Sequence, residues 1–109
     1  MRVARDGSSF SWGTDVVDLS RNKLLARLLR ALAQERLSSP GSSLTVNALM
    51  EIGWPGEKMR RDAGQNRVYV AIAALRRAGL AGELERDEVG YRLRPVLRVE
   101  LYESAPVRE

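Results

Sequence analysis

Apolar residues recur at helical spacing in three stretches of the chain, and the longest stretch comes first. Between residues 21 and 36 the predicted helix has one apolar face, while Arg27 and Arg30 lie on the other side. Ser20 is the expected N-cap, and the Ser-, Pro- and Gly-rich stretch 38–43 ends the helix. The apolar face consists of Leu24, Leu25, Leu28, Leu29 and Leu32.

A second, shorter helix is predicted over residues 46–52. Thr45 is its expected N-cap, because a hydroxyl oxygen can accept from the free N–H groups of the first turn. Leu49 and Ile52 face inward, and Gly53 ends the helix.

A third helix is predicted over residues 62–77. Asp62 followed by Gln65 has the spacing of a capping box, and Gly79 suits the residue that closes a helix in the left-handed conformation. The inward face is formed by Val68, Ile72 and Leu75.

Short runs with β-type composition surround the helices. Residues 10–12 and 16–19 flank a Gly-Thr-Asp turn and predict a hairpin. Residues 83–86 and 90–93 predict a second hairpin directly after the third helix, in which Gly90 suits a turn or a bulge. The chain therefore belongs to the α+β class.

The remaining segments set the domain boundaries. Leu44 is expected to make one short strand contact, and residues 96–101 are a further strand that completes the sheet or pairs across a dimer. Residues 1–9 are expected to be a flexible lead-in and residues 102–109 a frayed tail, which leaves one domain over residues 10–101.

The composition argues against an enzyme. The 109 residues include no Cys and no His, which excludes disulfides, thiolate nucleophiles, Cys/His zinc sites and imidazole bases. We therefore expect no catalysis, no cofactor, no metal and no small-molecule substrate. No apolar stretch approaches the about 20 residues that cross a bilayer, so we expect a cytoplasmic protein without a membrane partner.

Positive charge is concentrated in one half of the chain. The formal net charge is +4, from 18 Lys and Arg against 14 Asp and Glu. Residues 54–78 alone hold six cations and two acids, and nearly all of the cations are arginines, whose planar forks suit phosphate. This pattern is typical of a phosphate-facing surface, although a solvated face or a genome rich in Arg codons would also produce it.

Two motifs in this half resemble the winged helix-turn-helix effector domain of OmpR/PhoB-type bacterial response regulators. One is the apolar and basic pattern of the third helix: Val68, Val70, Ile72, Leu75 and Arg76. The other is the Gly-Tyr-Arg-Leu signature of the wing: Gly90, Tyr91, Arg92 and Leu93. Trp54 matches a tryptophan that often follows the second helix of that family, and the resemblance extends over residues 10–101.

The resemblance implies a bacterial transcription regulator that binds double-stranded DNA, with helix 62–77 in the major groove and the second hairpin against a minor groove. A helical wheel then assigns Asn66, Arg67, Val70, Ala73, Ala74 and Arg77 to the DNA side. The preceding loop adds Lys58, Arg60 and Arg61, and the hairpin adds Arg86 and Arg92. Dimerisation, or attachment to other domains of a larger regulator, is expected to strengthen binding.

Two features depart from this family and support an alternative. Ala73 and Ala74 replace polar base-reading residues, and the acidic pair Asp87-Glu88 at the hairpin tip is expected to repel phosphates. The alternative is a winged-helix protein-interaction module that binds a partner through the smooth strip around Val70. Among the other residues, Tyr91 is expected in the core, Tyr69 half-buried, and Arg76 in either a structural or a phosphate contact.

Overall fold

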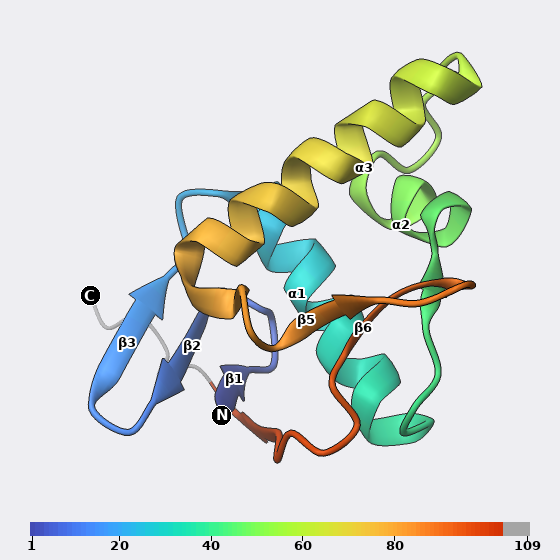
Figure 1. The fold of residues 1–109 in the computed structure, drawn as a ribbon. Helices are drawn as coiled ribbons and strands as arrows, with labels where there is room; N and C mark the ends of the chain where they lie inside the picture. Colours follow the sequence, from blue (N-terminus) through green and yellow to red (C-terminus); the bar gives the residue numbers. More distant parts are fainter. Residues whose placement is uncertain (104–109) are drawn as a thin grey trace.

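The computed structural model describes residues 1–103 and has three α-helices and two β-sheets (Figure 1). The elements follow in chain order as β1 (Arg2–Ala4), β2 (Ser9–Trp12), β3 (Asp15–Asp18), α1 (Lys23–Ser38), β4 (Leu44–Thr45), α2 (Val46–Gly53), α3 (Arg61–Leu75), a π-helical turn (Arg76–Leu80), β5 (Leu84–Arg86), β6 (Gly90–Leu93) and β7 (Glu100–Tyr102). The α+β class is thus confirmed.

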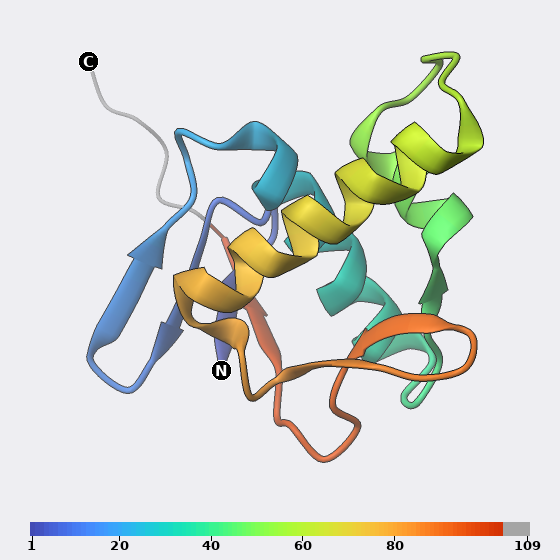
Figure 2. The ribbon, with the colours of Figure 1, turned by 45° about the horizontal axis from the view of Figure 1, so that its top comes forward.

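Helix α1 is the centre of the core. It contacts α2, α3, β1 and β6, and α3 crosses over it in Figure 2. Its predicted apolar face is confirmed, with Leu25, Leu28, Leu29 and Leu32 buried and Leu24 partly buried. These leucines pack against the inward faces of the other two helices, where Leu49, Val68, Ile72 and Leu75 are buried as predicted.

Two of the predicted helix starts are wrong. Helix α1 is capped by Asn22, whose side-chain oxygen accepts from the backbone N–H of Leu25 at 3.1 Å, whereas Ser20 belongs to a turn held by the Asp18 carboxylate. Helix α3 starts at Arg61, so Asp62 lies inside the first turn and accepts from the N–H of the next residue. Both Ser and Asn are good caps. The chain makes a turn in which the N–H of Asn22 donates to the carbonyl oxygen of Leu19, so the helix starts after Asn22 and not after Ser20.

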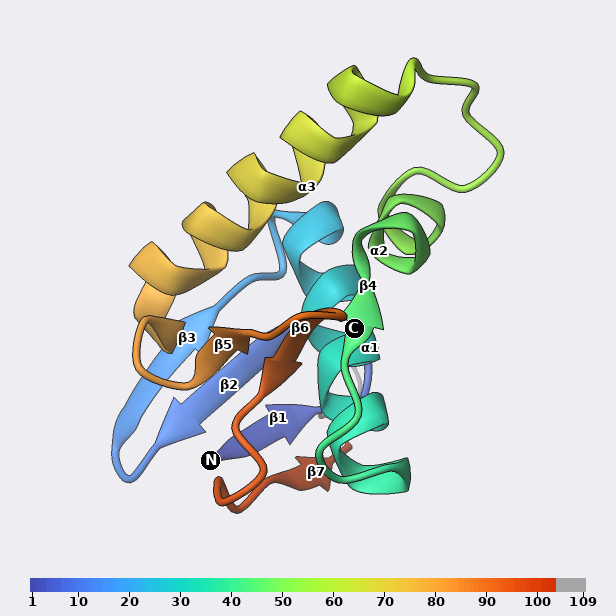
Figure 3. The same cartoon turned by 45° about the vertical axis from the view of Figure 1, so that its right-hand side comes forward.

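The N-terminal residues form a strand, which corrects the expected lead-in over 1–9. Val3 and Ala4 are fully buried because β1 pairs with β2 on one side and with β7 on the other. The resulting four-stranded sheet has the order β3-β2-β1-β7, with β7 parallel to β1 and the other pairs antiparallel (Figure 3). The predicted β2–β3 hairpin is confirmed.

The second sheet has three antiparallel strands in the order β4-β6-β5. Strand β4 immediately precedes α2, and Thr45 caps that helix as predicted by accepting from the N–H of Ala48. The predicted hairpin over 83–86 and 90–93 is therefore confirmed as β5 and β6, and β4 ties it to the start of α2.

The expected strand over residues 96–101 is wrong over most of its length. Only Glu100–Tyr102 forms a strand, and Val96 is 85% exposed. Leu97 and Val99 are nevertheless buried in the core. Tyr102, placed in the frayed tail, belongs to β7, and the rest of that predicted tail from residue 104 onward lies outside the described residues. Within residues 1–103 no helix is both long and apolar enough to cross a membrane.

Candidate nucleic-acid interface

Helix α3 has one buried face and one free face. The face toward α1 and α2 buries Val68, Ala71, Ile72 and Leu75. The opposite side forms an outer ridge: Asn66, Val70, Ala73 and Arg77. Val70 is 59% exposed, although it is apolar. Asn66, Val70 and Arg77 are exposed and Ala73 is half-buried, with Arg77 in the π-helical turn that continues α3, so most of the ridge faces solvent.

An apolar groove runs along one flank of this ridge, with a volume of about 280 Å³. Trp54, Val70 and Ala74 line it together with Leu24 from the start of α1. Arg67 lies at its rim, 5.9 Å from the Trp54 ring and 3.3 Å from the Glu57 carboxylate. Four of the groove residues were predicted as DNA contacts, namely Asn66, Arg67, Val70 and Ala74, and Arg67 pairs with Glu57.

Three exposed cations lie at the start of α3: Lys58 and Arg60 in the preceding loop, and Arg61 as the first residue of the helix, whereas the sequence predicted all three in the loop. Lys58 and Arg61 make no ion pair with any residue in the described part of the chain. Arg60 is 86% exposed and lies 3.6 Å from Asp62, a separation and exposure at which an ion pair contributes little. This end of α3 is therefore electropositive and solvated.

The β5–β6 hairpin has two chemically different faces because side chains alternate along a strand. On one face Arg86 lies opposite Tyr91, and on the other Glu85 lies opposite Arg92. Arg92 is held by the Glu85 carboxylate at 2.8 Å and by the carbonyl oxygen of Gly41 at 2.7 Å. Arg92, which was predicted to contact the DNA backbone, is thus already bound within the fold. Arg86 has no carboxylate partner among residues 1–103.

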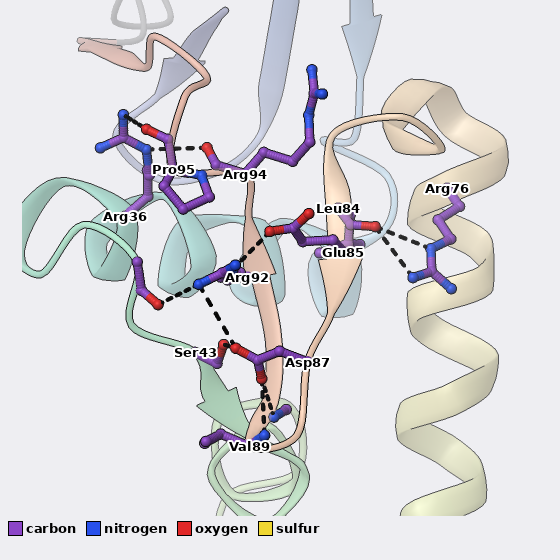
Figure 4. A network of polar contacts seen from close by, with 12 residues as sticks. Arg36, Ser43, Arg76, Leu84, Glu85, Asp87, Val89, Arg92, Arg94 and Pro95 are labelled. Atoms are coloured by element: carbon purple, nitrogen blue, oxygen red, sulfur yellow. Dashed lines mark hydrogen bonds and ion pairs between the residues drawn. The ribbon is translucent and has the colours of Figure 1, made fainter.

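One of the two carboxylates at the tip of the hairpin, that of Asp87, is engaged by the fold (Figure 4). The Asp87 carboxylate accepts from the hydroxyl of Ser43 and from the backbone N–H groups of Val89 and Gly90, and it lies 3.8 Å from Arg92. The Ser43 hydroxyl first, and then the Gly90 N–H, hold the pKa of Asp87 below its ordinary value. Of the acidic pair, Glu88 alone lacks such contacts within the described residues and faces solvent.

The end of α3 is attached to the hairpin by an arginine. Arg76 donates to the carbonyl oxygen of Leu84 at 3.2 Å (Figure 4). Its guanidinium also lies 5.8 Å from the Tyr91 ring centroid. The structural alternative for Arg76 is therefore the one observed. Tyr91 is only 4% exposed, which confirms the predicted core position, and Tyr69 is 38% exposed.

Comparison with protein-family models, curated sequences and solved structures found no match for this chain.

One contact escaped the sequence reasoning. The guanidinium of Arg86 lies 5.6 Å from the ring centroid of Tyr69 on α3, so the hairpin reaches the helix through this pair. The cross-strand register of the hairpin is enough to place Arg86 beside Tyr91. The contact with Tyr69 has no sequence signal, because it depends on how α3 lies relative to the hairpin.

Proposed function

We propose that this chain is a winged helix-turn-helix module that binds double-stranded DNA in bacterial transcriptional regulation. In this proposal α2 and α3 are the helix-turn-helix, α3 enters the major groove, and the β5–β6 hairpin is the wing. The module acts by binding and carries out no catalysis. One observation carries the proposal: α3 leaves an uncovered ridge between an electropositive loop and a hairpin that adds a further unpaired arginine.

The dimensions of the ridge suit a major groove, which is about 12 Å wide and admits one helix. Asn66 can pair with an adenine edge, and Arg77 with guanine or with a phosphate. Val70 and Ala73 between them can contact only apolar groups, of which the thymine methyl is the one that DNA offers in this groove. Direct readout would therefore rest on few positions.

Phosphate contacts supply most of the binding energy in this account. Lys58, Arg60 and Arg61 at one end of α3 and Arg86 on the wing are placed to neutralise the backbone. Asp87 is engaged within the fold, so it repels phosphates less than the sequence suggested. Four neutralised phosphates correspond to a slope of about −4 in a plot of log affinity against log salt concentration.

Fluorescence anisotropy of a labelled duplex, measured over a range of salt concentrations, tests the proposal. The variant Arg77→Glu reverses a charge on the ridge, and Arg30→Glu makes the same charge change on the exposed side of α1, beside Ile52. We expect Arg77→Glu to weaken binding at least tenfold more than Arg30→Glu. Wild-type binding that does not depend on salt, or equal effects of the two variants, would contradict a DNA contact at this ridge.

The apolar groove favours a second candidate, a protein-interaction module. A groove lined by Trp54, Val70, Ala74 and Leu24 can accept a large apolar side chain of a partner. This second candidate predicts no duplex binding at any salt concentration and a partner interaction abolished by Ala74→Asp. The DNA proposal instead predicts that Arg77→Glu is the damaging change.

A further inference from the structure

The Arg86 guanidinium lies near two aromatic rings at the junction of α3 and the hairpin. Its guanidinium carbon lies 5.6 Å from the ring centroid of Tyr69 and 5.6 Å from that of Tyr91. Guanidinium groups bind aromatic faces at such distances, by about 0.5–1 kcal/mol at an exposed site. The side chain of an exposed arginine is thus restrained to one place.

A second guanidinium shares one of these rings. Arg76 lies 5.8 Å from the Tyr91 centroid and is fixed by its hydrogen bond to the carbonyl oxygen of Leu84. Neither arginine makes an ion pair with a carboxylate in residues 1–103. A guanidinium without a carboxylate partner is able to bind an external anion.

The neighbouring acids do not provide that anion. Glu85 points to the opposite face of the hairpin, where it binds Arg92, and Asp87 is engaged by Ser43, Arg92 and the turn backbone. Glu85 and Asp87 are therefore engaged within the fold, whereas neither Glu88 nor Arg86 makes an ion pair with any residue of 1–103.

The rings also lower the cost of binding. Arginine loses side-chain freedom when it holds a ligand, and a guanidinium already restrained by its surroundings loses less. Tyr91 is almost completely buried, while Tyr69 is 38% exposed.

From this geometry we propose that Tyr69 is the positioning residue of Arg86, the hairpin arginine that the proposed function assigns to a backbone phosphate. The ligand is a backbone phosphate of the duplex on which α3 lies. This inference rests on the proposed DNA-binding function and adds to it a defined contact and the residue that prepares it.

The salt dependence of duplex binding tests the contact. Arg86→Gln removes one phosphate contact, so the slope of log affinity against log salt becomes shallower by about 0.9 and affinity falls roughly tenfold. Arg98→Gln is the matched control, because Arg98 is an exposed arginine beside β7 that pairs with Glu100. We expect this control to keep the wild-type slope.

Substitutions at Tyr69 test the positioning role. Tyr69→Phe keeps the aromatic face and is expected to bind as wild type, whereas Tyr69→Leu removes it and is expected to lose about two- to fivefold in affinity. Thermal unfolding of both variants checks that the fold is kept. Equal affinities for the Leu and Phe variants would overturn the role of the ring.

The outcomes separate this inference from the proposed function. A wild-type protein that fails to bind duplex refutes the function itself. Salt-dependent wild-type binding with an unchanged slope for Arg86→Gln refutes only the contact. If inorganic phosphate binds in an Arg86-dependent way while the duplex slope stays unchanged, the site takes free anions and the DNA contact is likewise refuted.

Discussion

Gly90 is the residue at which the three-stranded sheet has the least room, and replacing it with Ala is the most specific test of how β4 packs against β6. A Cβ added to Gly90 would lie 2.0 Å from the carbonyl oxygen of Leu44 and 2.9 Å from the Cα of Thr45. Both are backbone atoms of β4, which cannot rotate away. The Gly90→Ala variant must therefore separate β4 from β6.

The expected loss follows from what that separation breaks. Strand β4 is joined to β6 by the Leu44–Tyr91 and Thr45–Gly90 pairs alone. Losing about two backbone hydrogen bonds and part of the burial of Leu44 costs about 2–4 kcal/mol. For a domain of this size the unfolding temperature would fall by roughly 10–25 °C.

Circular dichroism during thermal unfolding measures this shift, with Gly82→Ala as the matched control. A Cβ added to Gly82 would meet no heavy atom within 4 Å, so this replacement should leave the unfolding temperature unchanged or slightly raised. If the free energy of unfolding of Gly90→Ala differs from that of the wild type by less than about 0.5 kcal/mol, the close approach of β4 to β6 is refuted.

Three further predictions concern the hairpin, the ridge and the C-terminal segment. The folded-state pKa of Asp87 is lowered, so its ionised form adds stability above about pH 4, and this stability is lost as the pH falls. The Asp87→Asn variant should therefore be less stable than the wild type at pH 7, and the difference in unfolding free energy should disappear in acid. A difference that does not depend on pH would refute this. On a duplex selected for tight binding, replacing thymine by deoxyuridine should weaken wild-type binding about fourfold for each methyl group that the protein contacts. The Val70→Ala variant should lose less affinity on this replacement. Equal losses for the two proteins would exclude a thymine contact by Val70. Arg36 donates to the carbonyl oxygens of Arg94, Pro95 and Leu97, so Arg36→Met should lose about 2–3 kcal/mol in urea unfolding, and an unchanged midpoint would show that these bonds add nothing.

The elements around the candidate site were largely predictable because their signals are local. The spacing of Val68, Ile72 and Leu75 defines the buried side of α3, and it therefore also defines the ridge that carries Asn66 and Arg77. The β5–β6 hairpin was predictable because two short β-type runs lie close together in the chain. The Thr45 cap was predictable because a threonine directly precedes the helical pattern.

The remaining features depend on contacts between distant segments. The burial of Val3 requires β7, almost a hundred residues away, and nothing within residues 1–9 indicates that partner. The charge of Arg92 was visible in the sequence, but its engagement by Glu85 and the Gly41 carbonyl depends on hairpin register and on the path of the loop after α1. Gly90 was interpreted as a turn residue, whereas it is small because β4 lies against it.

The most direct test of the candidate site is to locate the residues that DNA contacts. Titration of the isotope-labelled chain with a duplex, followed by backbone amide chemical shifts, measures this residue by residue. We predict that the largest changes lie on the outer ridge of α3, in the loop that contains Lys58, and at Arg86, with β2 and β3 unaffected. Changes centred on the four-stranded sheet, or no changes at low salt, would contradict the proposal that α3 is the DNA-reading element.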